Sequence, residues 1–161
     1  MITLTALRRI HPAAGLVATA TILAFWTSTT GALLFASPEA MVTVKRTIAW
    51  GLILLIPALA TTGATGSILG RGSQNPIVRA KQRRMTVIAA TGLLVLVPCV
   101  LYLAATITTV RSESAAFWTV QTIELLAGAT NITLMSLNIR DGLQLTRRLA
   151  RGKQPRRRIT N

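Results

Sequence analysis

The sequence predicts an all-α polytopic membrane protein, built as an antiparallel bundle of four transmembrane helices. Hydrophobic residues make up 51% of the 161 positions and charged residues only 14%, which is too few charges to cover a soluble domain. The charges are also clumped. Residues 10–38, 47–70 and 85–110 contain none, and 114–139 contain only Glu124. Each interval exceeds the roughly 20 residues that a helix needs to cross about 30 Å of hydrocarbon.

These intervals define the expected domain organisation. A transmembrane domain of residues 1–145 precedes a basic tail of residues 146–161, and its spans lie at about 12–35, 47–69, 85–108 and 115–139. The first interval follows Arg8 and Arg9, as a signal peptide would, but it is nearly twice as long as the roughly 7–15 apolar residues of such a segment. We therefore expect an uncleaved first helix, with Pro12 in its first turn.

Prolines and glycines mark the second and third spans. Lys45 and Arg46 are expected to close a short outer loop before the second span. Gly66 and Gly70 form a Gly-x-x-x-Gly pair, which is typical of a close-packing helix surface in membranes. Pro57 and Pro98 each remove a backbone N–H from a span, so we expect kinks at both positions.

The fourth span carries a polar face. At spacings of three and four residues, its members lie along one side of a helix: Gln121, Glu124, Gly128, Asn131, Met135 and Asn138. Apolar residues cover the remaining sides, so this face is expected to point toward the other helices rather than toward lipid. The amides are expected to serve as interhelical hydrogen bonds, worth about 0.6 kcal/mol each.

Glu124 is the only acidic residue within a span, and an ionised carboxylate there costs several kcal/mol unless it is paired or hydrated. We expect no basic residue at its depth. The leading interpretation is a neutral carboxyl group hydrogen-bonded to hydroxyls such as Thr27 or Thr30. The alternative interpretation is a proton or cation relay.

The net charge of +14 is distributed unevenly. Of the 18 Lys and Arg residues, 15 lie before the first span, in the second loop or after the fourth span. This asymmetry predicts that both termini are cytoplasmic, in the inner membrane of a bacterium, with anionic lipid headgroups as partners. The terminal run of arginines has no interleaved aromatic residues, so no nucleic-acid partner is expected.

The single histidine, His11, stands at the cytoplasmic mouth of the first span. It is followed by Gly15, and Thr30-Gly31 lies near the end of that span. In this respect the stretch from Arg8 to Leu34 resembles the first membrane helix of PepSY-type inner-membrane proteins. Some members of that family bind haem b, so the resemblance implies haem b binding through His11. A methionine would have to supply the second ligand, and the two at the same depth are Met85 and Met135.

The sequence contains no recognisable catalytic set. Cys99 is the only cysteine, and no nucleophile, zinc or phosphate-loop motif is present. The leading functional hypothesis is a small, non-enzymatic accessory or structural subunit of a membrane complex, which binds other membrane proteins or itself. The alternatives are a b-type haem or quinone-linked electron-transfer subunit and, third, a proton-coupled carrier that uses Glu124.

Overall fold

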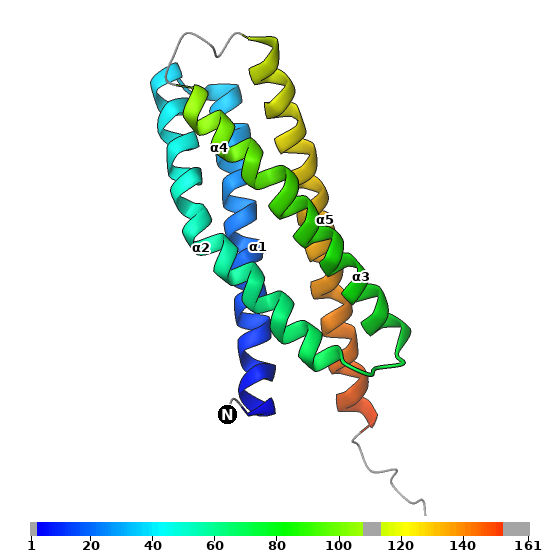
Figure 1. Ribbon diagram of the computed structural model, residues 1–161. Helices are drawn as coiled ribbons and strands as arrows, with labels where there is room; N and C mark the ends of the chain where they lie inside the picture. The colour runs from blue at the N-terminus through cyan, green and yellow to red at the C-terminus, as the bar shows by residue number, and fades with distance from the viewer. Residues whose placement is uncertain (1–2, 108–113, 153–161) are drawn as a thin grey trace, which may run out of the picture.

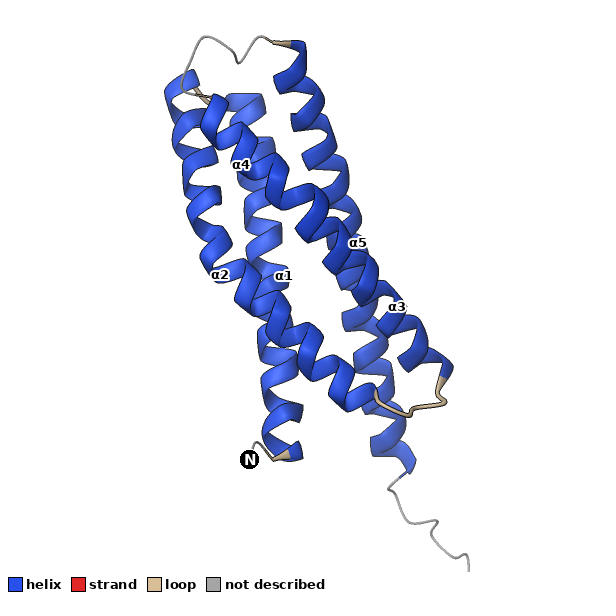
Figure 2. Cartoon of the chain, viewed as in Figure 1, coloured by secondary structure: helices blue, strands red, loops and turns tan. Residues whose placement is uncertain are grey.

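The structure, a computed structural model, is an antiparallel bundle of long helices (Figure 1). It describes residues 3–107 and 114–152, with the backbone alone for 148–152. The helices are α1 (Leu4–Phe35), α2 (Pro38–Gly70), α3 (Pro76–Thr91), the π-helix η1 (Gly92–Leu96), α4 (Val97–Thr106) and α5 (Ala115–Gly152). Within these residues no strand is present (Figure 2). The all-α prediction is therefore confirmed.

The bundle has two distinct ends. The upper end in Figure 1 holds the turn between α1 and α2, while the lower end holds the N-terminus, the α2–α3 connection and the end of α5. The most extensive helix contact is that between α1 and α2. The segments α3, η1 and α4 follow one another without a break and cross between α2 and α5.

Polar caps set where the helices begin. A side-chain oxygen accepts a hydrogen bond from a backbone N–H of the first turn at each of four caps, which are Thr3, Ser37, Asn75 and Ser114. Pro38 and Pro76 occupy the next position, where the missing N–H costs nothing. Gly72 has a φ of 73° and makes the turn after α2.

Four helix boundaries lie outside the predicted spans. Helix α1 begins at Leu4, so Pro12 lies inside the helix and not in its first turn as expected. Helix α2 begins at Pro38, so Lys45 and Arg46 belong to the helix and not to a loop. Helix α3 begins at Pro76, well before the expected span. Helix α5 continues without interruption to Gly152, through the first part of the predicted tail. The remainder of that tail and the loop around Arg111 lie outside the described residues.

Pro57 and Pro98, where kinks were expected, differ in the helix that surrounds them. Around Pro98 the expected disturbance takes the form of η1, in which the Val97 N–H bonds to the Gly92 carbonyl, five residues back. Such a π-turn offers an alternative to the hydrogen bond that the proline removes. Pro57 lies within α2, which remains α-helical on both sides of it.

The core lies between α1, α2, α5 and the continuous helical stretch formed by α3, η1 and α4. Its main cluster of buried side chains is Ala18, Ile22, Ile48, Leu52, Leu55, Ile88, Val100 and Met135. Glycines bring the helices close together. A Cβ on Gly51 would clash with the Phe25 ring, and one on Gly66 would lie 2.9 Å from His11 Cε1. Gly66 and Gly70 are close-packed as predicted, because a Cβ on Gly70 would meet Gln82.

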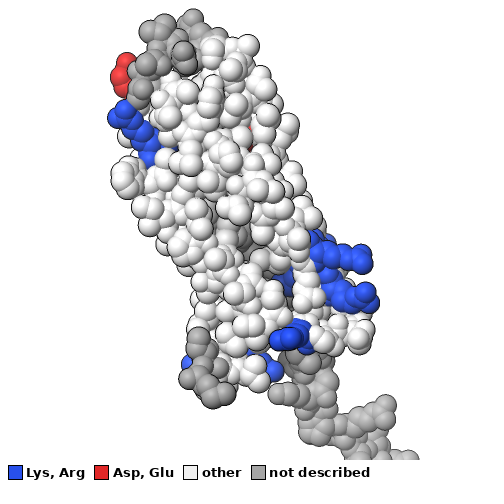
Figure 3. Space-filling model, viewed as in Figure 1, with Lys and Arg blue, Asp and Glu red and all other residues white. Residues whose placement is uncertain are grey.

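Three helical rods are long and apolar enough to cross a membrane by length and composition, namely Leu4–Phe35, Pro38–Gly70 and Pro76–Thr106. The space-filling view agrees with this composition, since the Lys and Arg residues visible there lie toward the two ends (Figure 3). Helix α5 is long enough, but its described residues are less apolar than those of the three other stretches, and it is not among them. Its first half carries Gln121, Glu124 and Asn131 among its apolar residues.

Candidate functional site

The polar face of α5 points into the bundle. Every member of the predicted series is buried: Gln121, Glu124, Gly128, Asn131, Met135 and Asn138. Phe117 and Asp141 extend the same face at its two ends and are also buried. This buried face of α5 thus extends at least from Phe117 to Asp141.

At the upper end of this face, Glu124 is paired with a buried lysine. Its Oε2 atom accepts hydrogen bonds from Lys45 Nζ at 2.5 Å and from Gln121 Nε2 at 2.9 Å. Lys45 is 1% exposed and Glu124 is 7% exposed. We call Lys45, Gln121 and Glu124 the upper site. Its two opposite charges neutralise each other inside the protein.

The upper site corrects two expectations. A basic residue is present at the depth of Glu124, and that carboxylate bonds to an ammonium and an amide rather than to hydroxyls. The hydroxyls of Thr27 and Thr30 instead donate to carbonyls of their own helix. Lys45 was missed because the second helix was expected to begin at residue 47, after the lysine. With α2 beginning at Pro38, Lys45 lies about 10 Å inside the helix, close to the roughly 13 Å of Glu124 from its own helix start.

Two signals in the sequence identify Lys45. Ser37-Pro38 is the cap and first-turn pattern with which a helix begins. Lys45 also precedes Ile48, Leu52 and Leu55 at spacings of three and four residues, so it lies on the buried face of α2. A lysine on the apolar face of such a helix needs an acidic partner, and the one acidic residue of the predicted spans is Glu124.

A small cavity of about 50 Å³ adjoins the upper site. Side chains from α1, α2, η1, α4 and α5 line it, and Glu124 is the only ionisable residue among them. Trp26 closes part of the wall by donating its indole N–H to the Leu125 carbonyl at 3.0 Å. Gly128 makes room for this ring, because a Cβ there would lie 3.0 Å from Trp26 Cδ1.

At the lower end of the face, Asp141 is paired with an arginine from α3. Arg84 donates from Nη2 to Asp141 Oδ2 at 2.6 Å and from Nη1 to Asn138 Oδ1 at 2.8 Å. Arg140 approaches the other oxygen of Asp141 at 3.4 Å. We call Arg84, Asn138, Arg140 and Asp141 the lower site. The Arg84 hydrogen bond holds the pKa of Asp141 below its ordinary value, against the opposing effect of burial.

Neither Arg84 nor Asp141 was among the predicted site residues. Both lie beyond the expected ends of the third and fourth spans, where charges were attributed to topology. The spacing nevertheless contains the signal, because Asp141 follows Asn138 by three residues and Arg84 precedes the buried Ile88 by four.

The amides between and within these sites are only partly satisfied. Asn131 Nδ2 donates to the Ile88 carbonyl at 3.4 Å, beside the start of η1. Three buried amide atoms have no hydrogen-bond partner among the described residues, namely Gln121 Oε1, Asn131 Oδ1 and Asn138 Nδ2. Internal water is the usual partner of such atoms. The amides connect helices as predicted, since Asn131 and Asn138 both reach α3.

The haem hypothesis concerns His11, Met85 and Met135. His11 Nδ1 lies 3.1 Å from both the Thr62 carbonyl and the Thr65 hydroxyl, and its ring packs on Gly66. Met135 is buried in the main core, and Met85 packs against that core. A haem between His11 and either methionine would have to displace packed side chains. In this arrangement the three residues therefore do not fit a haem.

No known protein family, curated protein or solved structure matches this chain. The fold and the two sites therefore define its class by themselves. It is an all-α helical bundle in which three helices are long and apolar enough to cross a membrane. The polar face of its remaining helix forms ion pairs inside the bundle.

Proposed function

We propose that this chain is a small, non-enzymatic integral membrane protein that serves as an accessory or structural subunit of a membrane complex. It binds other membrane proteins or a second copy of itself. In this proposal α5 forms the fourth span, both termini are cytoplasmic, and the membrane is the inner membrane of a bacterium.

The internal pairing of the polar face is the observation that supports this proposal. Glu124 and Asp141 are the acidic residues of α5, and both bond to basic residues within the bundle. Their pairing leaves no free carboxylate along that face for catalysis. It also lowers the cost of placing α5 in a bilayer, because paired and hydrogen-bonded charges are the ones that membranes tolerate.

The outer surface of the helices offers apolar side chains and two open helical glycines to other molecules. Large side chains such as Trp50, Ile53 and Leu126 are mostly exposed. At Gly31 and Gly63 an added Cβ would meet nothing within 4 Å. Small residues on the outside of a span allow another helix to approach closely, so these two positions support docking of a partner helix.

The experiment that tests the proposal is to measure particle size after mild detergent extraction from the native membrane. We expect the protein part of the particle to exceed the 17.2 kDa of one chain. The double substitution of Gly31→Leu and Gly63→Leu should reduce it toward one chain, while the matched control Ile53→Leu should not. A strictly monomeric wild-type particle would contradict the proposal.

A proton-coupled carrier is the second candidate, because Glu124 lines a small, partly open cavity between the helices. Protonation of that carboxylate would weaken its pairing with Lys45 and so couple proton binding to helix separation. In this case Glu124→Gln should abolish proton movement into proteoliposomes that contain the purified protein, as reported by a trapped pH-sensitive dye. Unchanged proton movement would remove Glu124 from the mechanism.

A further inference from the structure

The lower end of the bundle carries more positive charge than its acid can neutralise. Among the described residues Asp141 is the only acidic side chain there, since Glu39 and Glu124 lie in the upper half. Both oxygens of Asp141 are already occupied, one by Arg84 and the other by Arg140. Any further cation in this region therefore lacks a carboxylate of its own.

Lys81 is such a cation. It lies one turn before Arg84 on α3 and is partly buried, yet it makes no hydrogen bond to the described residues. The Lys81 ammonium is close enough to interact electrostatically with the side chains of His11, Asp141 and Arg84. A Cβ on Gly142 would lie 3.2 Å from Lys81 Nζ, so the ammonium lies against the bare backbone of α5.

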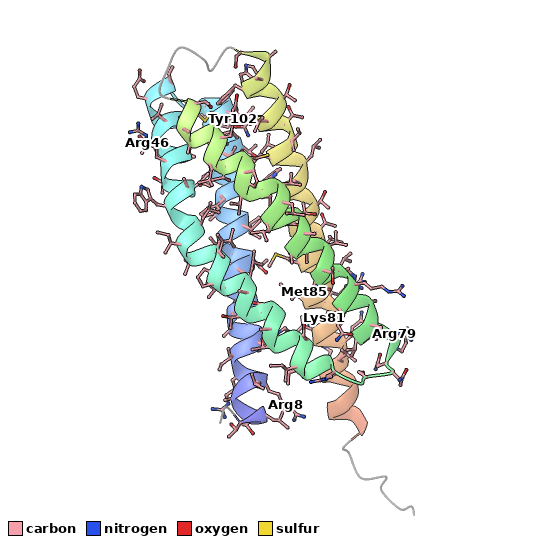
Figure 4. All side chains as sticks on the ribbon, in the orientation of Figure 1. Arg8, Arg46, Arg79, Lys81, Met85 and Tyr102 are labelled. Atoms are coloured by element: carbon pink, nitrogen blue, oxygen red, sulfur yellow. The ribbon has the colours of Figure 1, made fainter. Side chains whose placement is uncertain are left out.

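The position of Lys81 distinguishes it from the ordinary basic residues of this end. Figure 4 shows Lys81 in the space between α2, α3 and α5, whereas Arg79 lies at the outer side of α3. Other Lys and Arg side chains gather over the same part of the surface (Figure 3). An ammonium with unused donors between helices, among further cations, is a suitable partner for an anion.

The surroundings of Lys81 indicate what kind of anion would bind. Ile139 and Leu143, which flank Gly142 along α5, are 42% and 56% exposed, and Val87 on α3 is 48% exposed. These apolar side chains lie exposed on the two helices that carry Lys81 and Gly142, and they offer contact surface for hydrocarbon chains. An anionic amphiphile can bind both the Lys81 ammonium and the apolar side chains, whereas a free anion can bind only the ammonium.

We propose that Lys81, with Arg84 beside it, binds the phosphate of an anionic phospholipid headgroup between α3 and α5 at the lower end of the bundle. The Lys81 ammonium donates to the phosphate oxygens, and the acyl chains lie along Ile139, Leu143 and Val87. Arg84 remains bonded to Asp141 and contributes through its charge. This site would fix one lipid at a defined place, beyond the general attraction of basic loops for anionic membranes.

The test is to measure binding of phosphatidylglycerol to the purified full-length protein in mild detergent, by thermal shift and by native mass spectrometry. Phosphatidylcholine and inorganic phosphate serve as separate probes. We expect phosphatidylglycerol to bind the wild type and Lys81→Gln to weaken that binding about fivefold, which corresponds to ~1 kcal/mol for one basic residue at an anionic surface. The matched control Arg79→Gln removes an exposed charge from the same helix and should leave the affinity unchanged.

A second variant acts from the opposite helix without removing charge. Gly142→Ala places a Cβ against the Lys81 ammonium and should also weaken phosphatidylglycerol binding, while the helix keeps a favourable residue. This variant keeps the proposal testable if Lys81→Gln does not fold. Equal phosphatidylglycerol binding by the Arg79 variant and by either site variant would overturn the proposal. So would equal stabilisation by inorganic phosphate and by the lipid, because the site would then be one for free phosphate.

Discussion

The upper and lower sites contain the same types of residue in the same order along α5, and they differ in their surroundings. Each has an acidic residue on α5, an amide three positions before it, and a basic residue from another helix. The corresponding residues are Gln121, Glu124 and Lys45 at the upper end and Asn138, Asp141 and Arg84 at the lower end.

The difference lies in charge balance and access. At the upper site one ammonium meets one carboxylate, and both are almost completely buried. At the lower site two guanidinium groups share one carboxylate, the side chain of Arg140 is 62% exposed, and Lys81 stands nearby. The same arrangement of residues is therefore a closed structural contact at one end and an open, cationic surface at the other.

This comparison predicts the largest loss of stability when Lys45 is removed. Lys45→Met leaves the buried Glu124 carboxylate without its cation and with only the Gln121 amide as a partner, which should cost about 3–5 kcal/mol of unfolding free energy. Thermal unfolding in detergent, followed by tryptophan fluorescence, would measure it. The adjacent control Arg46→Met removes an exposed charge and should change stability little. The double variant Lys45→Met with Glu124→Leu should recover much of the loss, and no recovery would mean that the pair itself is not the cause.

Removal of Arg84 should have a smaller effect. Arg84→Ala takes a hydrogen bond from both Asp141 and Asn138, but water can reach this end and replace part of the lost interaction. We expect a loss of about 1–3 kcal/mol, measured in the same unfolding experiment, with the exposed Arg83→Ala as control. A loss as large as that for Lys45→Met would show that the lower site is as closed as the upper one.

The smallest expected effect is the pH dependence of the lower site. The pKa of Asp141 is lowered in the folded state by Arg84, so its pairing stabilises the protein at pH values above the unfolded pKa of about 3.9. This contribution should be lost as the pH falls below that value and through the folded pKa. Asp141→Asn should flatten the decrease of melting temperature at acidic pH, and an unchanged decrease would contradict the prediction.

The sequence determined the helical class and the orientation of α5. Spacings of three and four residues placed Gln121, Glu124, Asn131 and Asn138 on one face, and the cost of exposing such groups to hydrocarbon required that face to point inward. This conclusion needs no knowledge of neighbouring helices, because periodicity is a property of a single segment. All four residues are buried in the structure.

Only the tertiary structure decided which partners that face would meet. Lys45 comes from α2, 79 residues before Glu124, and Arg84 comes from α3, 57 residues before Asp141. Such pairings depend on where each helix begins, how far it enters the bundle and how it is rotated. A shift of the α2 start by nine residues was enough to move Lys45 from an expected loop into the core. The closed and the open site therefore arise from one local pattern on α5, and the packing of the other helices makes them different.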